Sequence, residues 1–285
     1  VCIDHRGLPS LDSHVAISRS EEPDSAFEYL KTVCSLLLDK LNVPVVIQNL
    51  PTPPEQIFGS FDSLAPESLR QRIADVNTRL HELIKTTPGF YLLDAASIAS
   101  TVGSRNWFDP VQWNLAKIPF HQSFTPIFAE YAVRVFASIR GISRKCLVLD
   151  LDNTLWSGVI GDDGIAGITI GQGSGLGEAH LELQKTALDL RSRGVILAVC
   201  SKNDESIARQ PFEQLPDMIL KTDHITVFKA NWTDKATNIE QIAKELNIGI
   251  NAIVFVDDNP VERNQVRGVL PEVAVPELPD DVSFY

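Results

Sequence analysis

The chain contains 285 residues, of which 44% are hydrophobic and 22% are charged. This is the composition of a folded globular protein, and it excludes a disordered, collagen-like or disulfide-rich chain. Acidic residues outnumber basic residues by 37 to 25, and the formal charge of −12 argues against nucleic acid as a partner. No apolar run approaches the roughly 18 residues that a membrane span needs, so we expect no membrane segment.

The four cysteines are far apart in the sequence and form no Cys-x-x-Cys pair: Cys2, Cys34, Cys146 and Cys200. This spacing argues against a disulfide framework or a zinc site, and it favours a reducing, cytoplasmic environment. The chain begins at Val1 without a signal peptide, and we expect it to be a piece of a longer protein.

The first half of the chain predicts alternating helices and strands. Ser25 and Glu28 have the spacing of a capping box and precede an apolar stripe at helical spacing. Next come a strand over 43–48, a helical stripe over 69–84, a strand over 90–93 and a helix over 123–139. This order predicts a small parallel sheet. The polar segment 140–145 marks a boundary, which gives a first α/β domain over 1–143 and a second domain over 144–285.

The second half has the regular alternation of a doubly wound parallel sheet. Strands are predicted over 146–149, 195–200 and 252–256, and helices over 178–193, over 234–246 and from Pro260 onward. Polar side chains follow each strand at once: Asp150 and Asp152, then Ser201, then Asp257 and Asp258. Each alone could be a helix cap or a solvated loop. Together they predict a site, because the carboxyl ends of parallel strands meet at one edge.

The charges at this edge indicate phosphoryl chemistry. Four carboxylates would repel each other, and Mg²⁺ is the divalent cation that oxygen ligands prefer. If Mg²⁺ bridges Asp150 and a phosphate oxygen, it neutralises the repulsion between the two anions, and Asp150 could attack phosphorus. Lys235 could add a second positive charge. Asp152 would protonate the leaving oxygen and then deprotonate water. Ser201 and main-chain N–H groups near Asn153 would hold the phosphoryl oxygens.

The same residues resemble, in order and spacing, the four motifs of the haloacid dehalogenase (HAD) superfamily of phosphotransferases: Asp150-Leu-Asp-Asn-Thr154, Ser201, Lys235 and Asp257-Asp258. The resemblance implies the roles just given for Asp150 and Asp152. It also implies a Mg²⁺ site formed by Asp150, Asp257 and the Asp152 carbonyl, with Asp258 close by. Thr154 of the first motif falls among the substrate-binding residues.

Longer stretches resemble the FkbH-like family, whose members are similar to HAD phosphatases but serve polyketide assembly lines. The stretches are 145–156, 159–161, 198–204, 231–232 and 256–263, with Ser157 where the family pattern has glycine. Such proteins take a glyceryl unit from 1,3-bisphosphoglycerate, remove the phosphates and load glycerate onto an acyl carrier protein as a thioester. The resemblance implies these two partners for this chain.

The first half looks like the C-terminal part of the SGNH-hydrolase-like domain that precedes the catalytic domain in that family. It contains no Gly-Asp-Ser nucleophile segment, and His121 has no aspartate three residues before it. We therefore expect a scaffold or a docking surface for the carrier protein rather than a hydrolase.

Several residues beside the motifs are candidates for substrate contact. Trp156 lies in the turn after the first motif, where contact with substrate and packing are both open. Lys202, Asn203 and Asn231 could bind the glycerate carboxylate or hydroxyl, or they could belong to ordinary polar loops.

Cys200 is a candidate for carrying the glyceryl group as a thioester, because it lies beside a catalytic motif. Direct transfer to the carrier thiol and Cys146 are the competing possibilities. Strand geometry argues against a thioester-carrying role for Cys200, because neighbouring residues of a strand face opposite sides of the sheet. If Ser201 faces the phosphate, Cys200 faces the core.

Two other functions fit the pattern besides a Mg²⁺-dependent enzyme of glyceryl transfer. One is a plain small-molecule phosphatase. The other is a non-enzymatic phospho-acceptor, since response-regulator receivers also combine an acidic cluster, a lysine and a phosphorylatable aspartate. The presence of Asp152 two residues after Asp150 argues against the receiver, because an acid/base serves turnover rather than storage.

Overall fold

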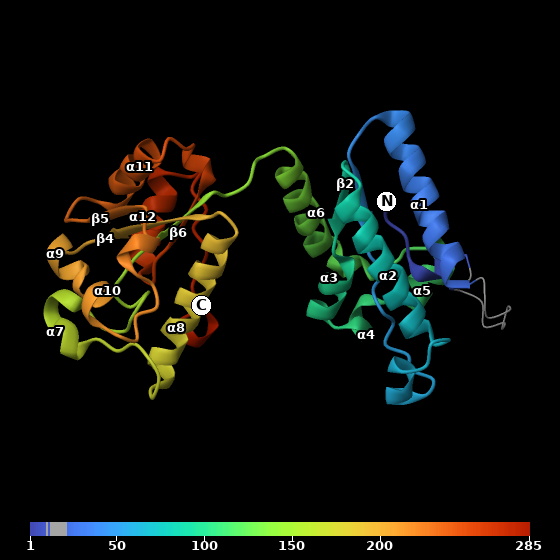
Figure 1. The fold of residues 1–285 in the computed structure, drawn as a ribbon, viewed down its shortest axis with the longest axis horizontal. Helices are drawn as coiled ribbons and strands as arrows, with labels where there is room; N and C mark the ends of the chain where they lie inside the picture. Colours follow the sequence, from blue (N-terminus) through green and yellow to red (C-terminus); the bar gives the residue numbers. More distant parts are fainter. Residues whose placement is uncertain (10, 12–21) are drawn as a thin grey trace. The chain divides into compact units, whose positions relative to one another are not determined.

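The fold is that of a computed structural model, which describes residues 1–9, 11 and 22–285 (Figure 1). The chain divides into two compact units, Val1–Gly141 and Ile142–Tyr285, and each is described by itself. Among the described helices, none combines the length and the hydropathy that crossing a membrane requires.

The first unit contains a two-stranded parallel sheet with helices packed around it. Strand β1 (Val45–Gln48) pairs with β2 (Phe90–Leu93), with Val45 opposite Phe90. The helices are α1 (Glu22–Leu41), α2 (Leu69–Thr86), α3 (Ala95–Val102), α4 (Ser104–Trp107), α5 (Pro110–Ala116) and α6 (Thr125–Ile139). The predicted small parallel sheet is confirmed, whereas the short helices α3 to α5 are additions to the prediction.

Helix α1 starts earlier than the capping-box prediction. It begins at Glu22, so Ser25 lies inside the helix rather than at its N-cap. Serine and glutamate three residues apart lie on the same face within a helix as well as at its start. Their spacing alone therefore does not show at which residue the helix begins. In α2, by contrast, Ser68 is the N-cap, and its side chain accepts a hydrogen bond from the N–H of Gln71.

The second unit contains a four-stranded parallel sheet in the order β5-β4-β3-β6. The strands are β3 (Cys146–Leu149), β4 (Ile196–Ser201), β5 (Val227–Ala230) and β6 (Ile253–Val256). The helices are α7 (Ile160–Gly167), α8 (Gly175–Ser192), α9 (Glu205–Ala208), α10 (Gln210–Gln214), α11 (Lys235–Glu245) and α12 (Pro260–Val269). The predicted doubly wound parallel sheet is confirmed.

Short 3₁₀ turns complete the described secondary structure, at His5–Gly7, Gly59–Ser63, Gln122–Phe124, Thr222–His224, Ile250–Ala252 and Val282–Phe284. In the second unit, two apolar clusters use alternate residues of the strands. One contains Leu147, Leu149 and Val199, and the other contains Val148, Ala198 and Cys200. Because alternate residues face opposite sides of a sheet, the two clusters lie on its two faces.

Edge strand β5 was not predicted. Only four residues long, it contains Lys229, whose Nζ lies 2.9 Å from Glu245 Oε2 on α11. A short strand with a charged residue gives no clear alternation, and its pairing with β4 depends on contacts distant in sequence. The central position of β3, between β4 and β6, brings the ends of the three predicted strands next to each other.

Candidate functional site

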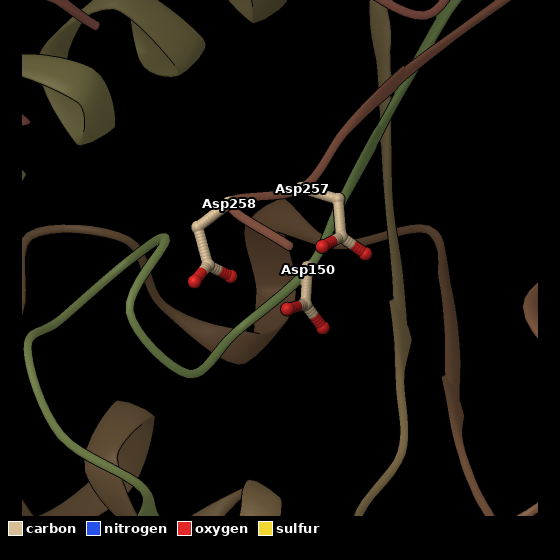
Figure 2. Close-up of side chains that lie close together, drawn as sticks. All are labelled: Asp150, Asp257 and Asp258. Atoms are coloured by element: carbon tan, nitrogen blue, oxygen red, sulfur yellow. The ribbon is translucent and has the colours of Figure 1, made fainter. Parts of the chain in front are cut away.

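Three acidic side chains converge at the carboxyl edge of the second sheet. Asp150 follows β3, and Asp257 and Asp258 follow β6. Figure 2 shows their carboxylates close together, and one oxygen from each lies within 4.8 Å of the others. Carboxylate oxygens at this spacing are the donor set that Mg²⁺ prefers, so the residues present fit this ion.

Lys235 lies against two of these carboxylates. It is the first residue of α11 and is only 3% exposed. Its Nζ lies 2.9 Å from Asp150 Oδ1 and also donates to Asp257 Oδ2. The predicted proximity of the lysine to the acidic cluster is therefore present in the fold, although the residues are far apart in sequence.

The pKa values of these groups reflect their burial and their mutual attraction. Burial raises the pKa of Asp150 to about 6, against the opposing effect of the Lys235 charge. Burial also raises the pKa of Asp257, and Lys235 again opposes it. Burial alone would lower the pKa of Lys235, but the charges of Asp150 and Asp257 outweigh it and raise that pKa above its ordinary value. Lys235 therefore stays charged at neutral pH.

Asp152 is fixed by three hydrogen-bond donors. Its Oδ1 accepts from the indole N–H of Trp156 and from the main-chain N–H of Ile160, both at 3.0 Å. Its Oδ2 accepts from the Asn203 amide at 2.7 Å. These contacts hold the side chain in one orientation and outside the group of three carboxylates that could hold a metal ion. The geometry is compatible with the predicted acid/base role of Asp152.

A pocket of about 200 Å³ opens at this edge. It is lined by Asp150, Asp152, Asn153, Ser201, Lys202, Lys235, Asp258, Asn259 and Glu262. Asn153 turns the chain with a left-handed backbone (φ 54°), and its side chain accepts a hydrogen bond from the N–H of Gly158. Pockets for drug-sized ligands measure roughly 300–1,000 Å³, so this volume suits a smaller substrate.

Two predicted substrate-binding residues, Trp156 and Thr154, lie outside the pocket lining. Trp156 is fully buried, packs edge-on against Phe212 and reaches the site through its hydrogen bond to Asp152. Thr154 is also fully buried, and its hydroxyl oxygen accepts from the N–H of Asp258 at 3.2 Å. This geometry gives no support to substrate contact by either residue: the indole orients Asp152, and the hydroxyl joins the loops after β3 and β6.

The other predicted contact residues divide between the pocket and its support. Lys202 lines the pocket, whereas Asn203 is buried beside it and donates to Asp152. Asn231 exchanges side-chain hydrogen bonds with Asn238 of α11, at 3.2 and 2.9 Å. Asn231 therefore orders the loop that leads to Lys235.

Cys200 faces away from the pocket. Its side chain is 0% exposed and belongs to the apolar cluster with Val148 and Phe255. Burial raises the pKa of the Cys200 thiol to about 12, and it does the same for Cys146. A buried, protonated thiol is a poor nucleophile, so this geometry gives no support to an acyl-carrying role for either cysteine.

Three residues that the sequence analysis missed support or line the site. His180 on α8 is buried, and its Nδ1 lies 2.8 Å from the carbonyl oxygen of Thr154. Arg263 on α12 donates to the carbonyl oxygens of Asp257 and Asp258, at 2.8 and 2.7 Å. Glu262, next to it, lines the pocket. The signal that could have identified Arg263 and Glu262 is their place in the stretch 256–263, which resembles the FkbH-like family.

The first unit also brings a serine, a histidine and an aspartate close together. His121 Nδ1 lies 2.7 Å from Ser123 Oγ, and His121 Nε2 lies 3.8 Å from Asp109 Oδ2. His121 Nδ1 also accepts a hydrogen bond from the N–H of Ser123. Asp109 Oδ1 accepts hydrogen bonds from the N–H groups of Val111 and Gln112 in the first turn of α5. Both side chains are thus helix caps, and the arrangement gives no support to hydrolase chemistry.

The chain resembles known proteins over both units. Residues 10–137 match the family model of the FkbH N-terminal domain. The crystal structure of the N-terminal part of the protein BF1531 from Bacteroides fragilis, containing a phosphatase domain and complexed with Mg, is 38% identical with a TM-score of 0.86. That match covers 94% of this chain and 71% of the other.

A HAD family enzyme from Bacteroides thetaiotaomicron, in complex with magnesium and inorganic phosphate, is 11% identical with a TM-score of 0.34, and the match covers 47% of this chain and 93% of that one. A search of curated proteins gave no match. The match to the B. fragilis protein covers 94% of this chain and therefore includes residues of both units. The chain therefore belongs to the FkbH-like family of the HAD superfamily.

Proposed function

We propose that the chain is a Mg²⁺-dependent phosphatase acting on small phosphorylated compounds. The observation that carries this proposal is the convergence of Asp150, Asp257 and Asp258 beside the buried ammonium of Lys235, at the base of a small pocket. The phosphatase domain of the B. fragilis relative, complexed with Mg, supports the same chemistry.

In this proposal the pocket residues divide the metal, nucleophile, acid/base and phosphate-holding roles among them. Mg²⁺ held by Asp150, Asp257 and Asp258 would offset the repulsion between a carboxylate and a phosphoryl group. The Asp150 carboxylate attacks phosphorus, and the bond to the leaving oxygen breaks as Asp152 donates a proton to it. Asp152 then takes a proton from water, which hydrolyses the aspartyl phosphate and frees Asp150. Ser201 and Lys235 hold the phosphoryl oxygens during both steps.

Phosphate release from small phosphate esters tests the proposal. Activity should disappear with EDTA and return with added Mg²⁺. Asp150→Asn is nearly isosteric and should lower the rate by about 10³-fold or more, as the loss of a covalent nucleophile does in other enzymes. A folded Asp150→Asn protein with undiminished activity would exclude Asp150 as the nucleophile.

From the family resemblance, we further propose that the substrate is 1,3-bisphosphoglycerate and that the glyceryl unit passes to an acyl carrier protein in polyketide biosynthesis. The free cysteines fit a reducing, cytoplasmic location for this reaction. Intact-mass analysis of the protein and candidate carriers, after incubation with 1,3-bisphosphoglycerate, tests this proposal. Glyceryl addition to a carrier supports it. Phosphate release without carrier modification indicates a plain phosphatase, and one retained phosphate per chain without turnover indicates a phospho-acceptor.

A further inference from the structure

An ion pair forms one wall of the pocket. Lys202 follows Ser201 at the end of β4, and Glu262 lies in the first turn of α12. Lys202 Nζ lies 2.6 Å from Glu262 Oε1, and both residues line the pocket. The pair therefore stands where the part of a substrate beyond its phosphoryl group would lie.

The two members of the pair differ in freedom. The side chain of Glu262 is 13% exposed, and its second carboxylate oxygen is buried without a hydrogen-bond partner among the described residues. The side chain of Lys202 is 37% exposed. Burial fixes the glutamate, whereas the flexible lysine can turn toward another anion without losing its hydration.

The charges of the pocket make Lys202 distinctive. The lining contains four carboxylates, from Asp150, Asp152, Asp258 and Glu262, and two ammonium groups, from Lys202 and Lys235. Lys235 already pairs with Asp150 and Asp257. Lys202 is thus the cation in the lining that a second anionic group of a substrate could use, and Glu262 competes for it.

We propose that Glu262 is a specificity-determining residue: by competing for Lys202, it sets how strongly the pocket prefers phosphate esters whose far end is anionic over esters whose far end carries hydroxyl groups. The anionic far end takes Lys202 from Glu262 on binding, and Glu262 takes it back as the product leaves. This inference rests on the proposed phosphatase function, because it assigns the far side of the same pocket.

Two esters of nearly the same shape test the inference. 3-Phosphoglycerate ends in a carboxylate, and glycerol 3-phosphate ends in a hydroxyl. Glu262→Gln keeps the size of the side chain and removes its charge, so it should raise the preference for 3-phosphoglycerate, measured as a ratio of kcat/KM values, by about fivefold. Lys202→Met should lower the same ratio by a similar factor.

The matched control is Glu205→Gln, which removes a first-turn carboxylate of α9 that pairs with Arg209 outside the pocket lining. The ratio of kcat/KM values for the two esters should be the same in Glu205→Gln as in the wild type. If the ratio is unchanged in Glu262→Gln, the inference is wrong.

A double variant separates competition for Lys202 from direct repulsion by Glu262. In a Lys202→Met background, Glu262→Gln should change the ratio by less than twofold, since no lysine is left to release. A change as large as in the wild-type background means that Glu262 acts by repulsion alone, and it overturns the proposal.

Equilibrium binding distinguishes a failure of this inference from a failure of the proposed function. The Kd values of both esters are measured by calorimetry with Mg²⁺ in an Asp150→Asn background, where no turnover occurs. If the wild type releases phosphate from neither ester nor from 1,3-bisphosphoglycerate, but Glu262→Gln still shifts the ratio of Kd values toward 3-phosphoglycerate, the specificity role stands and the phosphatase proposal fails. If the ratio of Kd values does not move, the specificity role is excluded whatever the activity.

Discussion

The two units of the chain use buried polar side chains in different ways. In the first unit, the buried Asn49 donates to Asp94 at 2.7 Å and accepts from the N–H of Ala96 at 2.9 Å. The half-buried Asn77 accepts from the N–H of Leu50 and donates to its carbonyl oxygen. These side chains tie loops to neighbouring backbone. In the second unit, charged side chains gather at the ends of strands. Buried polar side chains therefore occur both where they stabilise loops and at the candidate site. The site is distinguished by the convergence of several charged groups.

The charge of the chain is divided just as unequally. Residues 1–141 contain 12 basic and 15 acidic residues, and residues 142–285 contain 13 and 22. The unit with the proposed phosphate pocket thus carries most of the negative charge, which repels an anionic substrate at long range. Local cations must overcome this field, so removing the buried ammonium of Lys235 should slow phosphate release.

Lys235→Met should produce a large change in both rate and stability. We expect phosphate release to fall by about 100-fold or more, since a preorganised charge at a phosphoryl site is lost. The variant also leaves Asp150 and Asp257 buried without their cation, at a cost of about 3–5 kcal/mol in the free energy of unfolding. Thermal unfolding with and without Mg²⁺ should show the melting temperature recovered by the metal while the rate stays low. A rate within a few-fold of the wild type would make Lys235 a purely structural residue.

Trp156→Phe should have an intermediate effect on rate. The phenyl ring keeps the packing against Phe212 but removes the donor to Asp152. A hydrogen bond to a charged group contributes about 1.5–3 kcal/mol, so we expect kcat to fall by about tenfold or more. Steady-state kinetics should show a smaller change in KM. A raised KM with kcat intact would instead indicate that the indole contacts the substrate.

Asn49→Ala should affect stability without affecting rate. The variant removes the hydrogen bonds of the buried Asn49 side chain to Asp94 and to the N–H of Ala96, each of which contributes about 0.5–1.5 kcal/mol to the free energy of unfolding. Chemical denaturation followed by circular dichroism measures this loss. Slower phosphate release at unchanged stability would break the distinction between the two units.

Cys200→Ala should have the smallest effect. The thiol is buried away from the pocket, so phosphate release should stay within about twofold of the wild type. Mass spectrometry of the wild-type protein after incubation with 1,3-bisphosphoglycerate should find no glyceryl group on Cys200. If the variant loses carrier loading while keeping phosphatase activity, the thioester role of Cys200 is restored.

The arrangement of Asp150, Ser201 and Asp257 could be predicted because it depends on local patterns. Each residue follows an apolar strand, and parallel strands end at one edge. Strand β5 could not be predicted in this way, because four residues that include Lys229 gain their conformation by pairing with β4.

The contacts that support the site were beyond sequence reasoning for a different reason. Whether Trp156 faces the pocket or the core depends on the turn of the loop after β3, and its bond to Asp152 follows from that turn. The contact between His180 and the Thr154 carbonyl joins residues 26 positions apart. No periodicity in the sequence encodes such pairs, since they arise only when the elements pack.

The exposure of Trp232 has a spectroscopic consequence. This residue is 77% exposed and lies three positions before Lys235, whereas Trp107 and Trp156 are fully buried. A collisional quencher such as acrylamide will therefore reach Trp232 most readily and the half-buried Trp113 less readily, and it will spare the two buried indoles. Any ligand that reorders the segment between β5 and α11 alters the quenching of Trp232, so the chain carries its own optical reporter in the segment that leads to Lys235, and binding can be followed without a label.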